Sequence, residues 1–284
     1  MNKILILGAS GFIGSALYKE LTPYFDVYGT YHTATPDLAQ NQVMYSYDVT
    51  DDSLLVLLQK VQPNHVVVSL RGHFPDQLKA LSELCTYAQK NNTRIYYLSS
   101  VNVFDGTSKY ASYEEDPLLA QSLYGKFKVA AEKLLHSRLP KQQYAILRLP
   151  MVIGVNAPRI RQLKNAAKQR ASYEVYPNLI ISCTTEDRIA RQVHYIVNQE
   201  LSGIFHLCSK DVIHHSDLFE EIAQKLGLTQ IVFKTIYESN ENAYLAILPT
   251  KGKLPKQFNC KVQQIIQEVT LKEEIVTLKE NLDS

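Results

Sequence analysis

Three side chains in the middle of the sequence have the types and spacing needed to reduce a carbonyl group. Tyr124 and Lys128 are four residues apart, so they would share one face of a helix. Ser100 follows the apolar run 95–98, which is typical of a buried strand, and could lie opposite that face. A phenol, an ammonium and a hydroxyl around one point can protonate a carbonyl oxygen, provided that a nicotinamide cofactor supplies the hydride.

Each of these residue types has a chemical reason. A tyrosine hydroxyl with a pKa near 10 is a poor proton shuttle at neutral pH, and a cation such as Lys128 would lower that pKa. Ser100 would hydrogen-bond the same substrate oxygen as negative charge develops on it. The spacing alone is weak evidence, because a chain with 18 tyrosines among 284 residues is expected to contain one such pair by chance. A helix-face aromatic beside a solvated lysine is the competing interpretation.

The N-terminal sequence favours the catalytic interpretation over a chance pair. An apolar strand over 3–7 runs directly into a glycine turn, and a helical pattern over 12–21 follows and stops at Pro23. Strand, glycine turn and helix form the context in which a glycine pattern predicts dinucleotide binding, because backbone and helix N-terminus can approach a pyrophosphate. The cofactor contacts expected here are Gly8, Ser10, Gly11, Phe12, Ile13 and Gly14.

The next two strands bear on the choice of cofactor. The strand expected over 27–30 ends without the acid that would hold the ribose 2′-hydroxyl of NAD, which favours NADP, with His32 near the 2′-phosphate. His32 could equally be a solvated loop residue. After a third strand, over 44–47, Asp48 could hydrogen-bond the adenine, with Val49 beside it. Thr50 could instead cap a helix over 51–61.

The remaining pattern predicts an α/β fold with a doubly wound parallel sheet. Further strands over 65–69, 94–98 and 144–149 alternate with helices over 75–90 and 118–139. We expect a Rossmann-like domain over 1–150 and a smaller C-terminal lobe over 151–284, some segments of which return to the sheet. Helices are expected there over 186–197, 216–226 and 261–282, and a late strand of the lobe over 203–207. The stretch 156–173 is basic and contains no acid, so it could clamp a diphosphate or be a solvated helix face.

Composition argues against several classes of protein. The formal net charge of +2 gives no reason to expect a nucleic-acid or membrane-surface role. The four cysteines are widely separated, so they form no metal-ligand spacing and favour a reduced, cytoplasmic setting. The first apolar run, 4–7, is too short for a signal peptide, and no run approaches the ~20 residues of a membrane span. We therefore expect no metal, no nucleic acid and no membrane.

Taken together, these segments resemble the extended short-chain dehydrogenases/reductases. The resemblance rests on the glycine turn, on Ser99-Ser100 followed by Val103-Phe104-Asp105-Gly106, and on Tyr124-Gly-x-x-Lys128. Within that family the dTDP-4-dehydrorhamnose reductase-like group is most similar. The resemblance implies Ser100, Tyr124 and Lys128 as catalytic residues, NAD or NADP as cofactor, and a C-terminal lobe that closes over a nucleotide-sugar substrate. A homodimer is one option for the assembly.

The sequence departs from the family around the expected substrate. An Asn-Ala-Ala-Ala-like segment is replaced by 68–71, which brings Arg71 toward the cofactor, and a Thr-Asp-Tyr triplet is replaced by 100–102. Phe127 replaces the serine that commonly precedes the lysine, and 182–185 replaces a Gly-x-Pro-Thr-like segment. We therefore keep two hypotheses: an NAD(P)-dependent reductase or epimerase of nucleotide sugars, and a non-catalytic NAD(P)- or nucleotide-binding regulatory subunit.

Overall fold

The computed structural model describes residues 2–107, 109–237 and 239–282, with side chains placed up to residue 276. The chain divides into two compact units. Unit 1 comprises Met1–Val103, Ala120–Arg148 and Glu186–Phe205, and unit 2 comprises Phe104–Leu119, Leu149–Thr185 and His206–Ser284. The domain boundary expected at residue 150 lies near the break between Arg148 and Leu149. Two segments differ from the expected division: 104–119 belongs to unit 2, and 186–205 belongs to unit 1.

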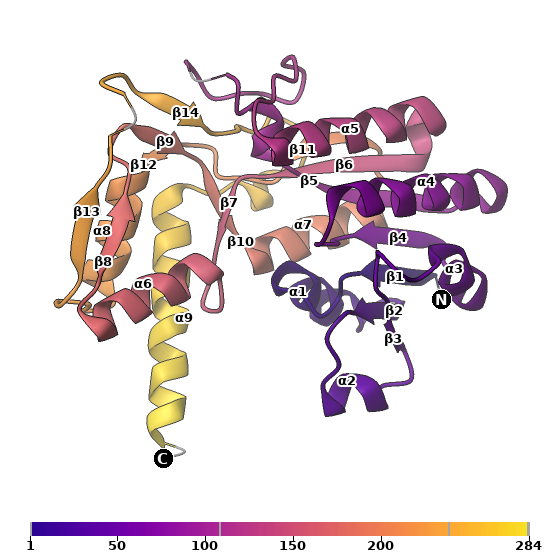
Figure 1. Ribbon diagram of the computed structural model, residues 1–284, viewed down its shortest axis with the longest axis horizontal. Helices are drawn as coiled ribbons and strands as arrows, with labels where there is room; N and C mark the ends of the chain where they lie inside the picture. The colour runs from indigo at the N-terminus through magenta and orange to yellow at the C-terminus, as the bar shows by residue number, and fades with distance from the viewer. Residues whose placement is uncertain (1, 108, 238, 283–284) are drawn as a thin grey trace. The chain divides into compact units, whose positions relative to one another are not determined.

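Unit 1 is built on a seven-strand parallel sheet with the order β11-β6-β5-β4-β1-β2-β3 (Figure 1). Its strands are nearly continuous apolar runs, as expected for a parallel sheet covered on both faces. The order reverses between β1 and β4, which creates a crevice at the carboxyl ends of these two strands. This architecture confirms the predicted fold class. The strands are β1 (Lys3–Leu7), β2 (Asp26–Tyr31), β3 (Met44–Ser46), β4 (His65–Val68), β5 (Arg94–Ser100), β6 (Tyr144–Leu149) and β11 (Gly203–His206).

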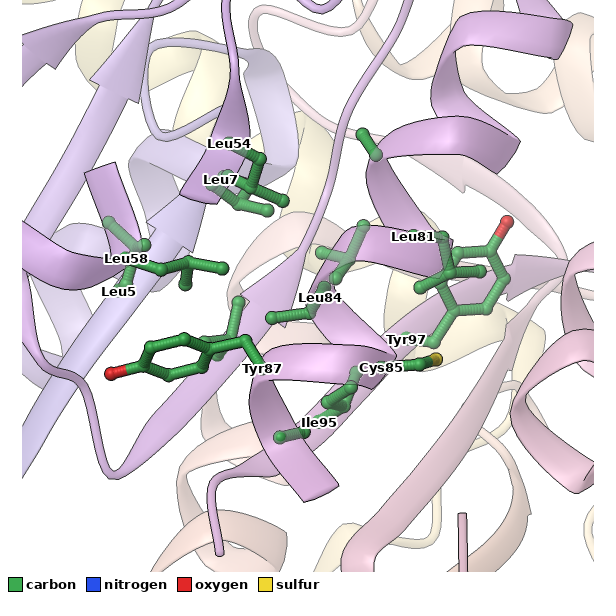
Figure 2. Packing of buried hydrophobic residues seen from close by; sticks show 14 of the residues in the cluster. Leu5, Leu7, Leu54, Leu58, Leu81, Leu84, Cys85, Tyr87, Ile95 and Tyr97 are labelled. Atoms are coloured by element: carbon green, nitrogen blue, oxygen red, sulfur yellow. The ribbon is translucent and has the colours of Figure 1, made fainter. Parts of the chain in front are cut away.

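Helices cover both faces of this sheet. On one face, α1 (Phe12–Leu21) packs against α7 (Glu186–Asn198); on the other, α4 (Phe74–Asn91) packs between α3 (Leu54–Val61) and α5 (Leu123–Arg138) (Figure 1). The second face holds an apolar cluster that includes Leu5, Leu58, Leu84 and Ile95 (Figure 2). Buried leucines recur at helical spacing along α3, at Leu54 and Leu58, and along α4, at Leu81 and Leu84, so each helix presents one apolar stripe to the strands. Shorter helical segments are α2 (Pro36–Gln40), η1 (Val101–Phe104) and η2 (Lys141–Gln143).

Unit 2 combines three small sheets with three helices. Its strands pair as β7 (Met151–Ile153) with β10 (Cys183–Thr185), as β8 (Ser172–Val175) with β13 (Val232–Thr235), and as β12 (Ile213–His214) with β9 (Leu179–Ile181) and β14 (Ala243–Leu245). Its helices are α6 (Pro158–Gln169), α8 (His215–Lys225) and α9 (Val262–Leu282), with a short η3 (Lys256–Phe258).

Three sequence-based predictions about elements were wrong. The strand at 203–207, expected in the substrate lobe, is β11 at the edge of the central sheet. The helix expected from residue 118 begins at Leu123, because the Ser122 hydroxyl accepts the Gly125 amide at 2.9 Å and caps it there. The helix expected over 51–61 begins at Leu54 after Ser53, so Thr50 is not its cap.

Candidate functional site

The glycine turn lets three backbone segments meet at the carboxyl end of β1. Gly8 has a φ of +85°, and a Cβ atom there would lie 2.5 Å from the Ser69 carbonyl oxygen. A Cβ atom on Gly14 would lie 2.0 Å from the Gly8 carbonyl oxygen. The Gly8 amide donates to the Thr30 hydroxyl at 2.7 Å, which ties the turn to β2. Glycine is therefore required at positions 8 and 14 for close packing of β1, β4 and α1.

A cavity of about 400 Å³ opens in front of this turn, at the carboxyl ends of β1, β2 and β4. Nine of the ten predicted cofactor contacts line it: Gly8, Ser10, Gly11, Phe12, Ile13, His32, Asp48, Val49 and Arg71. Gly14 does not, because it is packed beneath Gly8. Sequence reasoning missed seven further lining residues, all at or just after strand ends, and their position at the switch point could have found them: Thr30, Tyr31, Tyr47, Thr50, Ser69, Leu70 and Gly72.

At one side of the cavity, His32 and Asp48 form a pair. The His32 Nε2 atom lies 3.0 Å from Asp48 Oδ2, and the Thr50 amide donates to Asp48 Oδ1 at 2.8 Å. The Thr50 amide first, and His32 second, hold the pKa of the Asp48 carboxyl below its usual value against the effect of burial. Asp48 therefore stays ionised and holds the exposed imidazole of His32 at the cavity wall.

The loop after β4 brings a cation to the cavity. Arg71 lines it and, within the described part of the chain, forms no hydrogen bond or ion pair. The loop itself is fixed: Gln77 donates to the Gly72 carbonyl at 2.8 Å, and Phe74 packs its ring 5.9 Å from that of Tyr124. The guanidinium is thus placed between the cavity and the first turn of α5.

Ser100, Tyr124 and Lys128 all belong to unit 1 and meet where β5 ends beside α5. Tyr124 is 40% exposed, whereas Lys128 is only 6% exposed. The Lys128 Nζ atom donates to the Leu98 carbonyl at 2.8 Å and to the Tyr97 hydroxyl at 3.1 Å, and it lies 5.7 Å from the centroid of the Tyr124 ring. The three predicted catalytic residues are brought together, with the lysine pointing toward the strand.

The electrostatics of this cluster differ from the expectation that Lys128 lowers the pKa of Tyr124. Burial raises the pKa of Tyr124, and the groups that oppose this rise are Ser100, through a hydrogen bond, and Arg71, through its charge. Burial also lowers the pKa of Lys128 to about 7, with the Glu132 carboxylate opposing that shift. With a pKa of about 7, Lys128 carries its charge only part of the time at neutral pH, so it stabilises a phenolate less than a fully charged lysine would.

The residues that depart from the family pattern stack on, or form hydrogen bonds with, their neighbours. Phe127 stacks on Phe74 at a centroid distance of 4.6 Å, and the Asn102 amide donates to the Ser100 hydroxyl at 3.2 Å. In unit 2, Ser182 is buried and its hydroxyl accepts the Ile247 amide at 3.0 Å. The 182–185 segment therefore forms the buried strand β10 and its approach. These replacements are well packed.

The basic stretch of unit 2 forms α6 and is partly paired. Lys164 donates to Glu273 at 2.6 Å, while Arg159 has no hydrogen bond or ion pair among the described residues. The charge of Arg159 acts on Tyr173 and on His215, which lie in one aromatic cluster with Phe219. Burial first, and Arg159 second, lower the pKa of His215 to about 4. Arg159 thus acts on a buried ring cluster, in which His215 is 2% and Phe219 is 0% exposed.

Comparison with known proteins agrees with this geometry. The family described as RmlD substrate binding domain matches residues 76–275. The chain belongs to this family. Its predicted resemblance to dTDP-4-dehydrorhamnose reductases is confirmed.

Two relatives of this RmlD-family chain have names that point to different roles. It is 31% identical over 168 residues to methionine adenosyltransferase 2 subunit beta of Mus musculus, covering 54% of this chain and 48% of that protein. It is 25% identical over 251 residues to dTDP-4-dehydrorhamnose reductase of Aggregatibacter actinomycetemcomitans, covering 80% and 81%. The match to the mouse protein thus spans about half of its length.

A solved structure supports the fold. The dTDP-4-dehydrorhamnose reductase of Bacillus anthracis strain Ames, in complex with NADP, has a TM-score of 0.77, 16% identity, and coverage of 96% of this chain and 99% of that one. In the described segments of our RmlD-family chain, no helix is long and apolar enough to cross a membrane. Nor do the described His, Cys, Asp and Glu side chains gather in a group of three or more that could hold a metal ion.

Proposed function

We propose that this chain is an NAD(P)-dependent oxidoreductase that reduces a keto group of a nucleotide-activated sugar. The observation that carries the proposal is the meeting of Ser100, Tyr124 and Lys128 at the end of β5, in the same unit as the glycine-lined cavity. Membership of the RmlD family supports it.

The cavity fits a dinucleotide. Any side chain larger than hydrogen on Gly8 would collide with the Ser69 carbonyl, and Gly11 caps α1, so backbone N–H groups at a helix N-terminus remain free for a pyrophosphate. Arg71 would add a cation. A bound nicotinamide cofactor would supply the hydride. We favour NADP because β2 ends without an acid and His32 stands at the wall; solved neighbours carry either NADP or NAD.

The protein's own groups divide the remaining work. Since the pKa of Tyr124 is raised, its phenol stays protonated at neutral pH and is the proton donor to the substrate oxygen. The Ser100 hydroxyl, which bonds Asn102 and Tyr124, would hydrogen-bond that oxygen as it becomes negative. Lys128 donates a hydrogen bond to the Leu98 carbonyl, and its side chain lies against the Tyr124 ring and helps to hold the phenol in place.

The proton-donor role is tested by Tyr124→Phe. We expect turnover of a 4-keto nucleotide sugar to fall by at least about 100-fold, the lower end for loss of a general acid, while the Kd for NADPH changes little. The control is Tyr24→Phe, which removes a phenol that is 58% exposed on the same unit and should leave both quantities unchanged. Normal turnover in Tyr124→Phe would show that Tyr124 is not the proton donor.

For the nucleotide part of the substrate, we propose that Arg159 binds a phosphate while the cluster of Tyr173, His215 and Phe219 lies beside it in unit 2. Arg159→Gln should weaken binding of dTDP or UDP by about tenfold, since a charge-assisted hydrogen bond is worth about 1.5–3 kcal/mol. Lys168→Gln, on the same helix but without these rings, is the control. If Arg159→Gln and Lys168→Gln weaken binding equally, Arg159 has no specific role and the basic stretch is a solvated helix face.

A second candidate function is a non-catalytic regulatory subunit of the same fold. It is favoured by the relative named as a subunit of methionine adenosyltransferase, and by the replacements at Arg71, Asn102 and Phe127. Such a protein would bind the dinucleotide without changing its redox state.

We also propose a cytoplasmic location, because all four cysteines are buried free thiols.

A further inference from the structure

A line of buried polar side chains runs along α5 behind Tyr124. Tyr124, Lys128 and Glu132 occupy positions i, i+4 and i+8, so they share one face of α5, and α5 packs on β5. Ser99 of β5 donates to Glu132 Oε1 at 2.5 Å. Arg148 of β6 grips the same carboxylate with two bonds, Nε to Oε1 at 3.1 Å and Nη2 to Oε2 at 2.8 Å.

This network is fully buried: Glu132 is 0% exposed and Arg148 is 2% exposed. A buried ion pair adds little net stability over apolar residues of the same size, because both charges must leave water. An apolar contact would therefore hold α5 on the sheet equally well. The presence of charges at this place calls for a role other than packing.

The carboxylate of Glu132 is saturated by groups other than its helix neighbour. Arg148 and Ser99 together supply three hydrogen bonds to it, and Arg148 matches its charge. Lys128 is faced by Tyr97 and the Leu98 carbonyl from β5, and by Tyr124 and Glu132 from α5. Its two hydrogen bonds that we observe go to neutral oxygen atoms.

We propose that the Glu132–Arg148 pair is a positioning element for Tyr124 and Lys128: it fixes the register of α5 against β5 and, by binding Glu132 through Arg148 and Ser99, weakens the counter-charge that Glu132 offers to Lys128. The proposal deepens the proposed function and rests on it for its catalytic meaning. The part of the proposal that concerns the charge state of Lys128 can be tested without substrate or cofactor.

The consequence is a lysine that changes its charge near neutral pH, as its lowered pKa of about 7 indicates. If Arg148 is removed, the Glu132 carboxylate becomes available to Lys128 as a partner. An opposite charge within about 4–6 Å favours the charged form of a group, typically by 1–3 pKa units. If both charges are removed, Lys128 keeps its neutral surroundings.

The test is a titration of Lys128 by NMR in protein labelled with ¹³C at the lysine Cε atoms, with the signal assigned through Lys128→Met. We expect the midpoint to rise by at least about one pH unit in Arg148→Met and to stay near the wild-type value in Glu132→Leu/Arg148→Met. Circular dichroism verifies folding of each variant. If Arg148→Met does not fold, Arg148→Lys, which loses the bidentate grip, should give a smaller rise in the same direction.

An unchanged midpoint in whichever of these single variants folds would overturn the proposal. A merely structural ion pair would lower the melting temperature without moving the Lys128 titration. The measurement uses neither substrate nor cofactor, so it stands even if the chain proves to be a regulatory subunit. If the chain is an enzyme, the pH profile of kcat should move with the titration, while the KM for the nucleotide sugar stays within about twofold.

Discussion

At the residue scale, Lys128 is a buried lysine whose ammonium group is bound by two neutral oxygen atoms, those of Tyr97 and Leu98, instead of by water. A pKa near 7 in the folded state and near 10.5 in the unfolded state means that the unfolded chain binds more protons between these values. Stability should therefore rise with pH across this window, and the penalty is fully present below pH 7.

This gives a prediction about stability. The free energy of unfolding of the wild type, minus that of Lys128→Met, should increase by up to about 1.4 kcal/mol per pH unit between pH 7 and 9. Urea denaturation at both pH values measures it, and the difference between variants cancels the titration of other groups. A difference that is flat with pH would mean that Lys128 remains charged in the folded protein.

His32 carries the prediction about cofactor choice. His32→Ala should weaken NADPH binding by about tenfold, because a hydrogen bond to a charged phosphate is lost, and should leave NADH binding nearly unchanged. Isothermal titration calorimetry with both cofactors measures this. Equal losses for the two would show that His32 does not recognise the 2′-phosphate and, with Asp48, only shapes the cavity wall.

Much of the site could be predicted at this scale, because residue type and short spacing are local properties. Ser100, Tyr124, Lys128 and the glycine turn were identified from the sequence alone. The burial of Lys128 and its neutral partners on β5 could not be, because they depend on how α5 packs against a strand some 30 residues away. The pairing of His32 with Asp48 was missed for the same reason.

At the element scale, the packing of α1 on β1 decides whether the cavity exists. Gly14→Ala would place a Cβ atom 2.0 Å from the Gly8 carbonyl oxygen, whereas Gly11→Ala would place one at 3.3 Å from the same atom. We expect Gly14→Ala to lower stability by about 1–3 kcal/mol, as overpacking does, and to weaken NADPH binding, although Gly14 does not line the cavity. Gly11→Ala should have a smaller effect on stability; the reverse order would contradict the packing.

The loop between β4 and α4 makes a second prediction at this scale. Arg71→Gln should weaken NADPH binding by about tenfold and raise the pKa of Tyr124, since the guanidinium opposes that rise. Arg138→Gln, on the exposed end of α5, is the matched control. Calorimetry and ultraviolet titration of the phenol check both parts. If only the phenol responds, Arg71 serves the substrate side and not the cofactor.

Element boundaries and partners were less predictable than element types. The strand at 203–206 was recognised as a strand, yet its place beside β6 was not, since pairing across some 55 residues leaves no local signal. The start of α5 was predicted too early, because the apolar residues 118–120, just before the cap at Ser122, are equally typical of a helix.

At the scale of the whole molecule, the chain supplies two units with different chemistry. Unit 1 carries the glycine-lined cavity and the Ser100, Tyr124 and Lys128 cluster. Unit 2 carries Arg159, which has no hydrogen bond or ion pair within the described part of the chain and acts on a cluster of buried rings. The alternation of strands and helices predicted the first unit, because each βα repeat is a local pattern. The three small sheets of unit 2 have strands of two to four residues, too short for such a pattern to emerge.

The most direct measurement is transfer of deuterium from [4-²H]NADPH to a panel of 4-keto nucleotide sugars, read by mass spectrometry of the product. The account predicts a product one mass unit heavier than that formed with unlabelled NADPH, and no labelled product with Tyr124→Phe. If the wild-type protein binds NADPH but transfers no label to any member of the panel, the reductase proposal is contradicted and the regulatory subunit takes its place.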